Sequence, residues 1–317
     1  MDAVRDLIPD LRAATEAAAI AAHAWRGRKD GKAADGAAVK AMRATFDRVP
    51  FDGRVAIGEG ERDEAPMLYI GEPLGSAVGQ PGAPRIDIAV DPLECTTNCA
   101  LDRPNALAVL AAAPRGTLLH APDCYMDKLA GGPDLAGRIS LDASIEWNVE
   151  VVADIRDKSI EDVTVTMLDR PRHADHLKAI EAMGAKVDLI SDGDIAGALR
   201  AADPESPTDL LLGIGAAPEG VITATALLGV GGVFEGRLNL KDEEERRRAE
   251  AMVGDDIDRL WSASDLCASE DSVFVATGVC PGYLPGVETI PTGLRTTTEV
   301  IDVAASRRYT VENEHST

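Results

Sequence analysis

The sequence predicts an α/β protein built from two parts. Helical and strand-like patterns are mixed over the first half of the chain, and strands alternate with helices in the second half. Such alternation predicts a largely parallel sheet that helices cover on both faces. We therefore expect an N-terminal α+β domain over residues 1–155 and a C-terminal α/β domain over residues 156–317.

The N-terminal part begins with two helical patterns. Apolar residues at roughly helical spacing predict a helix over residues 7–25, and a basic loop at 26–32 leads to a second helix over 37–46. Apolar and β-branched residues then predict strands over residues 54–58, 86–90 and 105–113.

The C-terminal part is predicted from shorter patterns. Strands are expected over residues 163–168, 186–190, 210–214 and 272–279. Helices are expected over residues 173–183 and 241–252, and two more begin near 192–194 and 218–220. Because the helix over 241–252 is laced with charge, it is typical of a solvated face. The polar tail after Arg308 is expected to fray.

Composition indicates a globular protein and excludes several classes of function. The 317 residues are 45% hydrophobic and 27% charged, with a formal net charge of −22. This charge argues against a nucleic-acid partner, which requires a basic face. No run of apolar residues is long enough to cross a membrane, and the N-terminus does not resemble a signal peptide. We therefore expect a cytoplasmic protein without a membrane partner.

The five cysteines predict neither a disulfide framework nor a zinc site. They stand at positions 95, 99, 124, 267 and 280, which is an odd number without a CxxC pair. Disulfide frameworks are rare in cytosolic chains of this size. The pair at 95 and 99 has no matching histidine or cysteine pair that would complete a zinc site.

Two carboxylates follow the predicted strand at 86–90. Asp91 and Glu94 stand three residues apart, and Pro92 stiffens the turn between them. Two anionic groups this close repel each other unless a cation lies between them. Oxygen ligands of this kind favour Mg²⁺ or Mn²⁺ over softer metals. The alternative is that acids at the end of a strand are ordinary solvated turn residues, and this turn alone leaves both interpretations open.

Further acids lie near glycines in predicted loops and at predicted helix starts. They are, in chain order, Asp35, Glu59, Glu61, Asp63, Glu64 and Glu219. Glycine lets the backbone approach a ligand closely, and the glycine-containing turn before the helix near 218–220 also suits a phosphate. Solubility alone does not account for acids gathered in this way. The sequence therefore predicts a site for divalent cations and a phosphate.

A metal site of this kind is suited to phosphoryl transfer. Divalent ions lower the pKa of a bound water and neutralise a phosphoryl group, and the reaction needs little beyond positioning and charge stabilisation. Thr96 could orient the attacking water, and Arg170 and Arg172 could bind the far end of the substrate. Asp192 and Asp194 could hold sugar hydroxyls. Their alternative role is an ordinary helix N-cap.

Several longer motifs resemble the class II fructose-1,6-bisphosphatases. They are DGAAV at 35–39, IGEGERDEAPMLYIGE at 57–72, IDIAVDPLE at 86–94, NALAVL at 105–110, APD at 121–123, YM at 125–126, RPRH at 170–173, DGD at 192–194 and APEG at 217–220. That family belongs to the lithium-sensitive sugar phosphatases. The resemblance implies a layered α/β/α/β/α fold and hydrolysis of the 1-phosphate of a sugar bisphosphate in carbohydrate metabolism, such as gluconeogenesis.

The resemblance also implies roles for individual residues. Metal ligands for Mn²⁺ or Mg²⁺ would be Asp35, Glu59, Asp91, Glu94 and Glu219. The attacking water would be oriented by Thr96 with help from Asp63 or Asp35. The sugar-phosphate pocket would be lined by Lys32, Glu94, Cys95, Thr96, Tyr125, Arg170, Pro171, Arg172, Asp192, Gly193, Asp194 and Ala216. A small sugar phosphate would be the ligand, and the protein would form a homo-oligomer.

Three positions depart from the family pattern and leave alternatives open. Cys95 replaces the glycine of the D-P-[IL]-[DE]-G-T turn, Ala216 replaces a glycine before APEG, and Gly31 takes the place of a lysine, with Lys32 beside it. Fructose 1,6-bisphosphate is the default substrate of the family. The departures suggest as alternatives a different phosphorylated sugar or a non-catalytic homologue that binds metal and sugar phosphate. A redox switch between Cys95 and Cys99 is a weaker hypothesis, because neighbouring carboxylates disfavour a thiolate.

Overall fold

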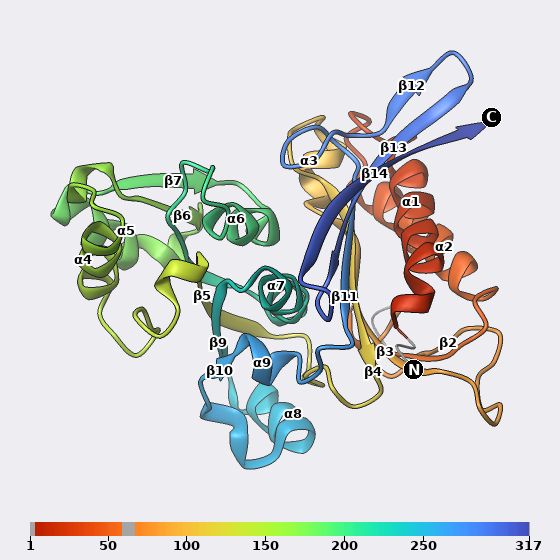
Figure 1. Cartoon of the computed structure of the whole chain (residues 1–317), viewed down its shortest axis with the longest axis horizontal. Helices are drawn as coiled ribbons and strands as arrows, with labels where there is room; N and C mark the ends of the chain where they lie inside the picture. The colour runs from red at the N-terminus through yellow and green to blue at the C-terminus, as the bar shows by residue number, and fades with distance from the viewer. Residues whose placement is uncertain (1–3, 59–66, 317) are drawn as a thin grey trace.

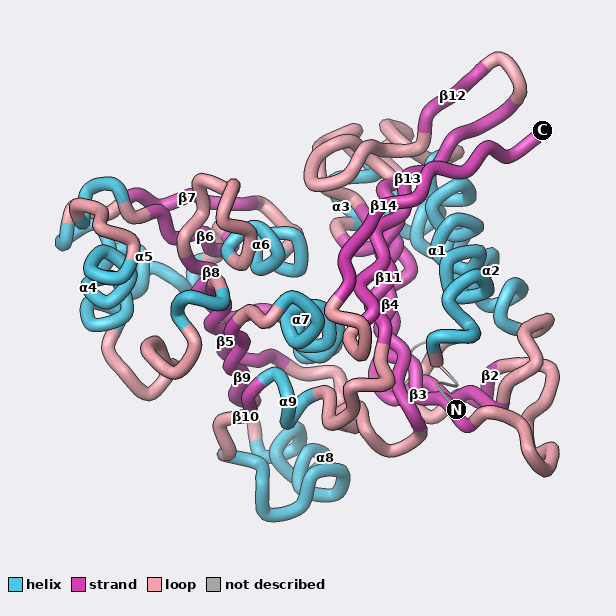
Figure 2. Tube along the Cα trace, viewed as in Figure 1, coloured by secondary structure: helices cyan, strands magenta, loops and turns pink. Residues whose placement is uncertain are grey.

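The chain folds into a mixed α/β protein with two mixed sheets (Figures 1 and 2). A computed structural model describes residues 4–58 and 67–316. The α/β prediction is confirmed at this level. No helix in the described ranges is both long and apolar enough to cross a membrane.

The larger sheet has eight strands among the described residues, in the order β12-β13-β11-β4-β3-β1-β2, and β14 pairs with β13. Only β1 and β3 pair in parallel within these strands. The strands are β1 (Asp52–Ile57), β2 (Pro73–Leu74), β3 (Arg85–Glu94), β4 (Leu107–Pro114), β11 (Val273–Gly278), β12 (Glu288–Ile290), β13 (Gly293–Asp302) and β14 (Arg307–Ser316).

Over the part of the chain that the structure describes, the smaller sheet has six strands in the order β10-β9-β5-β8-β6-β7. These strands are β5 (Tyr125–Gly131), β6 (Thr164–Leu168), β7 (Lys186–Ile190), β8 (Leu210–Ala216), β9 (Val233–Asn239) and β10 (Trp261–Ser262). Among them, only the pairs β6–β7 and β6–β8 are parallel. The prediction of a largely parallel sheet is therefore wrong. The reason is that β5 arrives from the larger sheet and inserts between β8 and β9, antiparallel to both.

Helices cover the sheets in layers (Figure 1). The helices are α1 (Ile8–His23), α2 (Gly31–Phe46), α3 (Thr96–Ala100), α4 (Ile145–Ile155), α5 (Ala174–Met183), α6 (Asp194–Ala201), α7 (Ala217–Val230), α8 (Glu243–Val253) and α9 (Ala263–Leu266). In Figure 1, α1 and α2 cover the outer face of the larger sheet, and α7 lies between the two sheets. Helices α4 and α5 lie on the other side of the smaller sheet.

Helix α7 is apolar around nearly its whole circumference because both sheets pack against it. Its residues contact β3, β4 and β11 of the larger sheet and β5, β8 and β9 of the smaller one. Such a helix lacks the polar face of a surface helix. Small residues allow the close packing: a Cβ placed on Gly229 would lie 2.4 Å from Ile301 of β13. This helix therefore connects the two sheets through one hydrophobic core.

The second helix begins earlier than predicted. It begins at Gly31 rather than near residue 37, because the Asp30 carboxylate accepts a hydrogen bond from the backbone N–H of Ala33. This is a standard N-cap interaction. Asp35 consequently lies inside the helix, not at its start.

The C-terminal segment returns to the larger sheet. Strand β11 pairs with β4. Strands β13 and β14 form a hairpin of ten residue pairs, in which Gly293 lies opposite Ser316 at one end and Asp302 lies opposite Arg307 at the other. The expectation of a frayed tail after Arg308 is therefore wrong, because those residues pair with a buried strand. The proposed boundary at residue 155 coincides with the end of α4. Each sheet contains strands from before and after this residue. The division into two domains stays a prediction.

Hydrogen exchange will distinguish a paired tail from a frayed one. We expect about half of the amides in residues 307–316 to be protected, because alternate N–H groups of an edge strand bond to the neighbouring strand. Peptide-level exchange measured by mass spectrometry checks this. The exposed loop at 78–83 serves as the internal reference for rapid exchange. Exchange of the tail as fast as this loop would contradict the strand pairing.

Candidate active site

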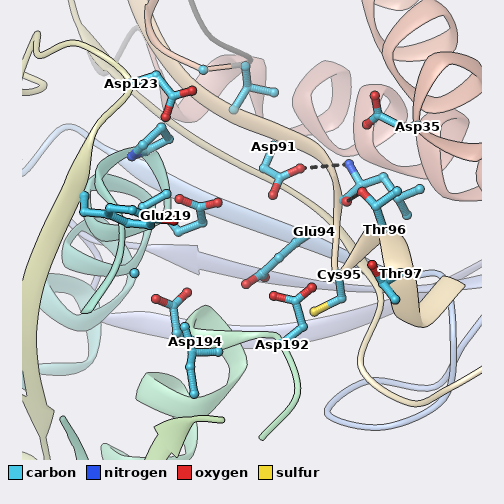
Figure 3. Close-up of a pocket in the computed structure, with 18 of the residues that line it drawn as sticks. Asp35, Asp91, Glu94, Cys95, Thr96, Thr97, Asp123, Asp192, Asp194 and Glu219 are labelled. Carbon is cyan, nitrogen blue, oxygen red and sulfur yellow. Dashed lines mark hydrogen bonds between the residues drawn. The ribbon is translucent and has the colours of Figure 1, made fainter. Parts of the chain in front are cut away.

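A pocket of about 520 Å³ lies where the two sheets approach each other (Figure 3). We call it the central pocket. It is lined by Lys32, Asp35, Gly58, Val90, Asp91, Leu93, Glu94, Cys95, Thr96, Thr97, Asp123, Tyr125, Leu168, Arg170, Arg172, Asp192, Asp194, Gly215, Ala216, Pro218 and Glu219. Acidic and basic side chains from both halves of the chain thus meet in one cavity.

An irregularity at the end of β3 brings its two carboxylates into the same pocket. The register between β3 and β4 shifts between Asp91 and Glu94, where Pro92 has no N–H to donate. In a regular strand, residues three apart point to opposite faces. The bulge removes this alternation, so both Asp91 and Glu94 line the central pocket. The Asp91 carboxylate also accepts the backbone N–H of Leu93 at 3.0 Å.

The Glu94 carboxylate is buried among other acids. Its Oε1 accepts a long hydrogen bond of 3.4 Å from the backbone N–H of Ile195, and its Oε2 has no partner among the described residues. Burial raises the pKa of Glu94 well above its usual range, and the charges of Asp194 and Glu219 raise it further. A buried carboxylate oxygen without a partner is costly unless a cation or a proton compensates it.

Glu219 presents a second oxygen of this kind. It lies in the first turn of α7, where Pro218 occupies a position that requires no N–H donor. Its Oε2 is buried and has no partner among the described residues. Burial raises the pKa of Glu219 to about 7, although the nearby Lys128 ammonium opposes the rise. Figure 3 shows Glu94 and Glu219 directed into the same space.

Cys95 adopts a backbone conformation that favours glycine. Its φ and ψ are 63° and 46°, in the left-handed region, and it precedes α3. A side chain there costs roughly 1–2 kcal/mol. The thiol is nearly buried, and its sulfur lies 3.0 Å from the point where a Cβ on Gly193 would stand. Burial raises the pKa of Cys95 well above its usual range, and the Glu94 charge adds to the rise, so the thiol is neutral.

The turn after Cys95 and helix α2 form the opposite wall. The Thr96 hydroxyl donates to the carbonyl of Leu93 at 2.9 Å, which leaves its oxygen lone pairs as acceptors. Asp35 and Lys32 reach the pocket from α2, and burial raises the pKa of Asp35. A Cβ on Gly31 would stand 3.0 Å from the Thr96 methyl. Gly31 therefore faces the Thr96 turn, while the cation at this wall comes from Lys32.

Cations lie across the pocket at the end of β6. The Arg172 guanidinium donates to the carbonyl of Ile214 at 3.1 and 2.7 Å and lies over the Tyr125 ring at 4.7 Å. Arg170 donates to the carbonyl of Ser191 at 2.7 Å and lies 3.8 Å from the Asp192 carboxylate. These contacts fix both guanidinium groups at the edge of the pocket.

His173 clamps the strands that carry these cations. Its Nδ1 lies 2.6 Å from the carbonyl of Leu168, and its Nε2 accepts the backbone N–H of Ile214 at 2.7 Å. The ring is therefore the neutral tautomer that carries its proton on Nδ1. Burial lowers the pKa of His173, although the hydrogen bond to Leu168 opposes the fall. Through Ile214, His173 fixes the carbonyl that holds Arg172.

The Asp192–Asp194 segment begins α6 without a side-chain cap. The N-cap residue is Gly193, which has a φ of 93°, and no side chain accepts a capping hydrogen bond there. The N-cap interpretation of the two aspartates therefore fails. Instead, Asp194 pairs with Lys128 at 2.6 Å, and burial raises the pKa of Asp192. Both aspartates line the central pocket.

The structure brings most of the predicted site residues together. Those that line the central pocket are Lys32, Asp35, Asp91, Glu94, Cys95, Thr96, Tyr125, Arg170, Arg172, Asp192, Asp194, Ala216 and Glu219. Pro171 and Gly193 stand between residues that line it. Glu59 and Asp63, with Glu61 and Glu64, lie outside the described residues. The roles of all these residues stay predictions.

Cys99 is in contact with Cys280, and the redox switch between Cys95 and Cys99 stays a prediction. Cys99 and Cys280 share a hydrogen bond that lowers the pKa of Cys99, and the Cys99 thiol lies 3.6 Å from the carbonyl of Ala22. The described cysteines, Cys95 and Cys99 among them, are all free thiols. Cys95 instead packs against Gly193.

Sequence reasoning assigned no role to Asp123 and Lys128. Asp123 lines the pocket just before Tyr125, and the APD motif contained its signal. Lys128 is buried beneath the pocket on β5, at 1% exposure. Met126 and Ala130, two residues before and after it on the same face of the strand, are fully buried. A lysine between two such apolar positions was the sequence feature that could have identified it.

Replacing Cys95 by glycine tests the left-handed turn. We expect the free energy of unfolding of Cys95→Gly to lie within about 1 kcal/mol of the wild-type value, because relief of the strained backbone offsets the lost burial of the thiol. Cys124→Gly is the matched control, since Cys124 is similarly buried but its φ is not positive. It should lose about 2 kcal/mol. Urea denaturation measures both, and an equal loss in the two variants would refute the interpretation.

The pH dependence of stability tests the His173 clamp. A histidine whose pKa is lowered on folding stabilises the protein fully above its ordinary pKa of about 6.5, and this contribution is lost as the pH falls toward the lower, folded-state value. We therefore expect the wild type to lose more free energy of unfolding than His173→Gln between pH 7.5 and 5.5. His176→Gln is the control, because it leaves both His173 hydrogen bonds in place. Denaturation at several pH values checks this, and parallel curves for wild type and His173→Gln would count against the clamp.

Comparison with known proteins identifies the family of the chain. A family model described as bacterial fructose-1,6-bisphosphatase, glpX-encoded, matches residues 5–315. A Synechococcus sp. (strain JA-3-3Ab) protein named D-fructose 1,6-bisphosphatase class 2/sedoheptulose 1,7-bisphosphatase is 44% identical over 308 residues, which cover 90% of this chain and 88% of that protein. A protein of the same name from Prochlorococcus marinus (strain MIT 9312) is 41% identical over 314 residues, which cover 95% and 93%. The chain therefore belongs to the family of bacterial, class II fructose-1,6-bisphosphatases.

Proposed function

We propose that this protein is a phosphatase that hydrolyses the 1-phosphate of fructose 1,6-bisphosphate and of sedoheptulose 1,7-bisphosphate. The observation that carries the proposal is the central pocket, which is lined by Glu94 and Glu219, each with one oxygen that has no partner among the described residues, and by Arg170 and Arg172. The carboxylates suit cations that neutralise a reacting phosphate, and the arginines suit the far phosphate. The names of the relatives add both sugar bisphosphates.

The donor set of the pocket fits Mn²⁺ or Mg²⁺. Its carboxylates are hard oxygen ligands, and the two buried oxygens without partners require a compensating positive charge. We propose Asp35, Asp91, Glu94 and Glu219 as ligands, together with Glu59, which lies outside the described residues. The described residues alone do not form a group of three such ligands around one point. When bound, such ions neutralise phosphoryl charge and lower the pKa of water.

Other residues of the pocket orient the attacking water and bind the rest of the substrate. The Thr96 oxygen accepts a hydrogen bond from a water and so orients it, since its own hydroxyl proton is directed to Leu93. Asp35, or Asp63 outside the described residues, assists that water. Arg172, fixed by Ile214 and Tyr125, binds the second phosphate in a geometry that suits its fork of donors. Asp192 and Asp194 accept hydrogen bonds from sugar hydroxyls.

The remaining parts of the proposal concern architecture and assembly. We infer that the order of helices and sheets is the layered α/β/α/β/α fold of the lithium-sensitive sugar phosphatases. We also propose that residues 1–155 supply most metal ligands, that residues 156–317 supply most sugar-phosphate contacts, and that the protein is a cytoplasmic homo-oligomer.

A phosphate-release assay tests the proposed activity. We expect Mn²⁺ or Mg²⁺ to support release from fructose 1,6-bisphosphate and sedoheptulose 1,7-bisphosphate, and EDTA to abolish it. Glu219→Gln should lower kcat by at least about 100-fold, since losing even a partner of a metal ligand costs 10- to 100-fold. Glu146→Gln, at an exposed position on α4, is the control and should retain full activity. No release from either bisphosphate with either metal would overturn the proposal.

A further inference from the structure

Lys128 is a buried lysine that the proposed function leaves without a role. It occupies an inward position of β5 and is 1% exposed. Its neighbours on the same face, Met126 and Ala130, belong to the apolar core between the sheets. Burying an ammonium group is costly unless a hydrogen-bonded anion compensates it. An apolar residue would fill this position at lower cost, so the charge calls for another explanation.

We propose that Lys128 is a positioning residue that orients the Asp194 carboxylate toward the sugar hydroxyls of the substrate. The proposal rests on the proposed function. The Lys128 ammonium donates to Oδ2 of Asp194 at 2.6 Å, and the two side chains are 2% and 9% exposed. Figure 3 shows the Asp194 carboxylate directed toward the same space as Glu94 and Asp192. With Oδ2 held from below, Oδ1 is the atom that can accept from a ligand.

The surrounding backbone is shaped to admit this ion pair. A Cβ on Gly215 of β8 would stand 1.9 Å from Oδ2 of Asp194 and 2.8 Å from Nζ of Lys128. Gly215 does not have a positive φ, so its backbone conformation does not require glycine. Gly220 of α7 is required by another neighbour, since a Cβ there would stand 2.5 Å from the Met126 sulfur but 3.4 Å from Cε of Lys128. The glycine that admits the ion pair is therefore Gly215.

The charges around the pair explain why Asp194 needs a cation. Asp194, Asp192 and Glu219 all face Glu94, and their negative charges disfavour its ionised form. Repulsion of this kind would turn the Asp194 side chain away from the other carboxylates. The 2.6 Å contact with Lys128 holds it in place instead. Arg170 and Arg172 cannot substitute, because their guanidinium groups are held by Ser191 and Ile214.

An anchored carboxylate recognises a hydroxyl better than a free one. A charged hydrogen bond fixes the plane of the Asp194 carboxylate, so the geometry is set before the sugar arrives. Such an interaction binds substrate and transition state alike, and its loss therefore raises KM more than it lowers kcat. This distinguishes Lys128 from a residue that takes part in the chemical step.

The test compares Lys128→Met, Asp194→Asn and the double variant with fructose 1,6-bisphosphate and Mn²⁺. We expect each single variant to raise KM by about tenfold or more, as for the loss of a charged hydrogen bond, and to change kcat by less than about threefold. The double variant should bind no more weakly than Asp194→Asn, because Lys128 contributes to sugar binding through Asp194. A further rise in KM in the double variant would overturn the proposal.

Lys158→Met is a control for ion-pair loss away from the central pocket. Lys158 lies 2.6 Å from a buried aspartate, Asp209, but it is 33% exposed, and Asp209 keeps Arg156 as a second partner. It should lower the Tm and leave KM unchanged. An equal rise in KM in this control would show a general effect of destabilisation and would contradict the assigned role.

Product binding provides a readout that is independent of turnover. Fructose 6-phosphate without added metal should raise the Tm of the wild type and of Lys158→Met, and should raise that of Lys128→Met by much less. If Lys128→Met keeps the wild-type KM and Tm shift, the proposal fails. If the wild type releases no phosphate from either bisphosphate, the proposed function fails instead, whatever Lys128→Met does. The folding of Lys128→Met is checked by its own thermal transition.

Discussion

Between the two sheets, the chain holds several carboxylates closer together than their mutual repulsion favours. Glu94 comes from β3 of the larger sheet, Asp194 from α6 and Glu219 from α7. Burial and neighbouring charge each raise the pKa of Glu94. The apolar packing of α7 against both sheets opposes this repulsion, and it leaves oxygens of Glu94 and Glu219 without partners in the described structure. The site therefore depends on a core that is rigid enough to keep like charges together.

Most of the elements could be predicted from the sequence. The site residues were predicted more reliably than the pairing of the strands that carry them. Asp91, Glu94, Arg170 and Arg172 could be named from short motifs, because the relevant residues are close in the chain. The bulge that brings Asp91 and Glu94 into the same pocket was not predicted. Strand β5 and its pairing were not predicted, and its partners β8 and β9 are about 80 to 110 residues away in sequence. The same holds for the tail: its pairing with β13 compensates for a polar composition that alone indicates fraying.

Lys128 shows a different limit of sequence reasoning. A lysine between Met126 and Ala130 at inward positions indicates that something unusual is buried there, but its partner lies 66 residues away at the start of α6. Residue patterns report how a side chain relates to its own strand, whereas the need for a counter-ion arises only when another element is folded against it. Gly215 is a similar case, because the reason for a glycine there, the space needed by Asp194 and Lys128, is apparent only in the folded structure.

At the Cys95 turn, the backbone conformation suits glycine, while the side chain is a buried thiol. The backbone there takes the left-handed conformation that suits glycine, although a cysteine occupies it. Because burial and the Glu94 charge raise the pKa of the thiol, Cys95 adds volume but no negative charge to the crowded carboxylates. Its sulfur packs toward Gly193, where glycine leaves the space it needs. The cysteine side chain is thus accommodated by the glycine beside it.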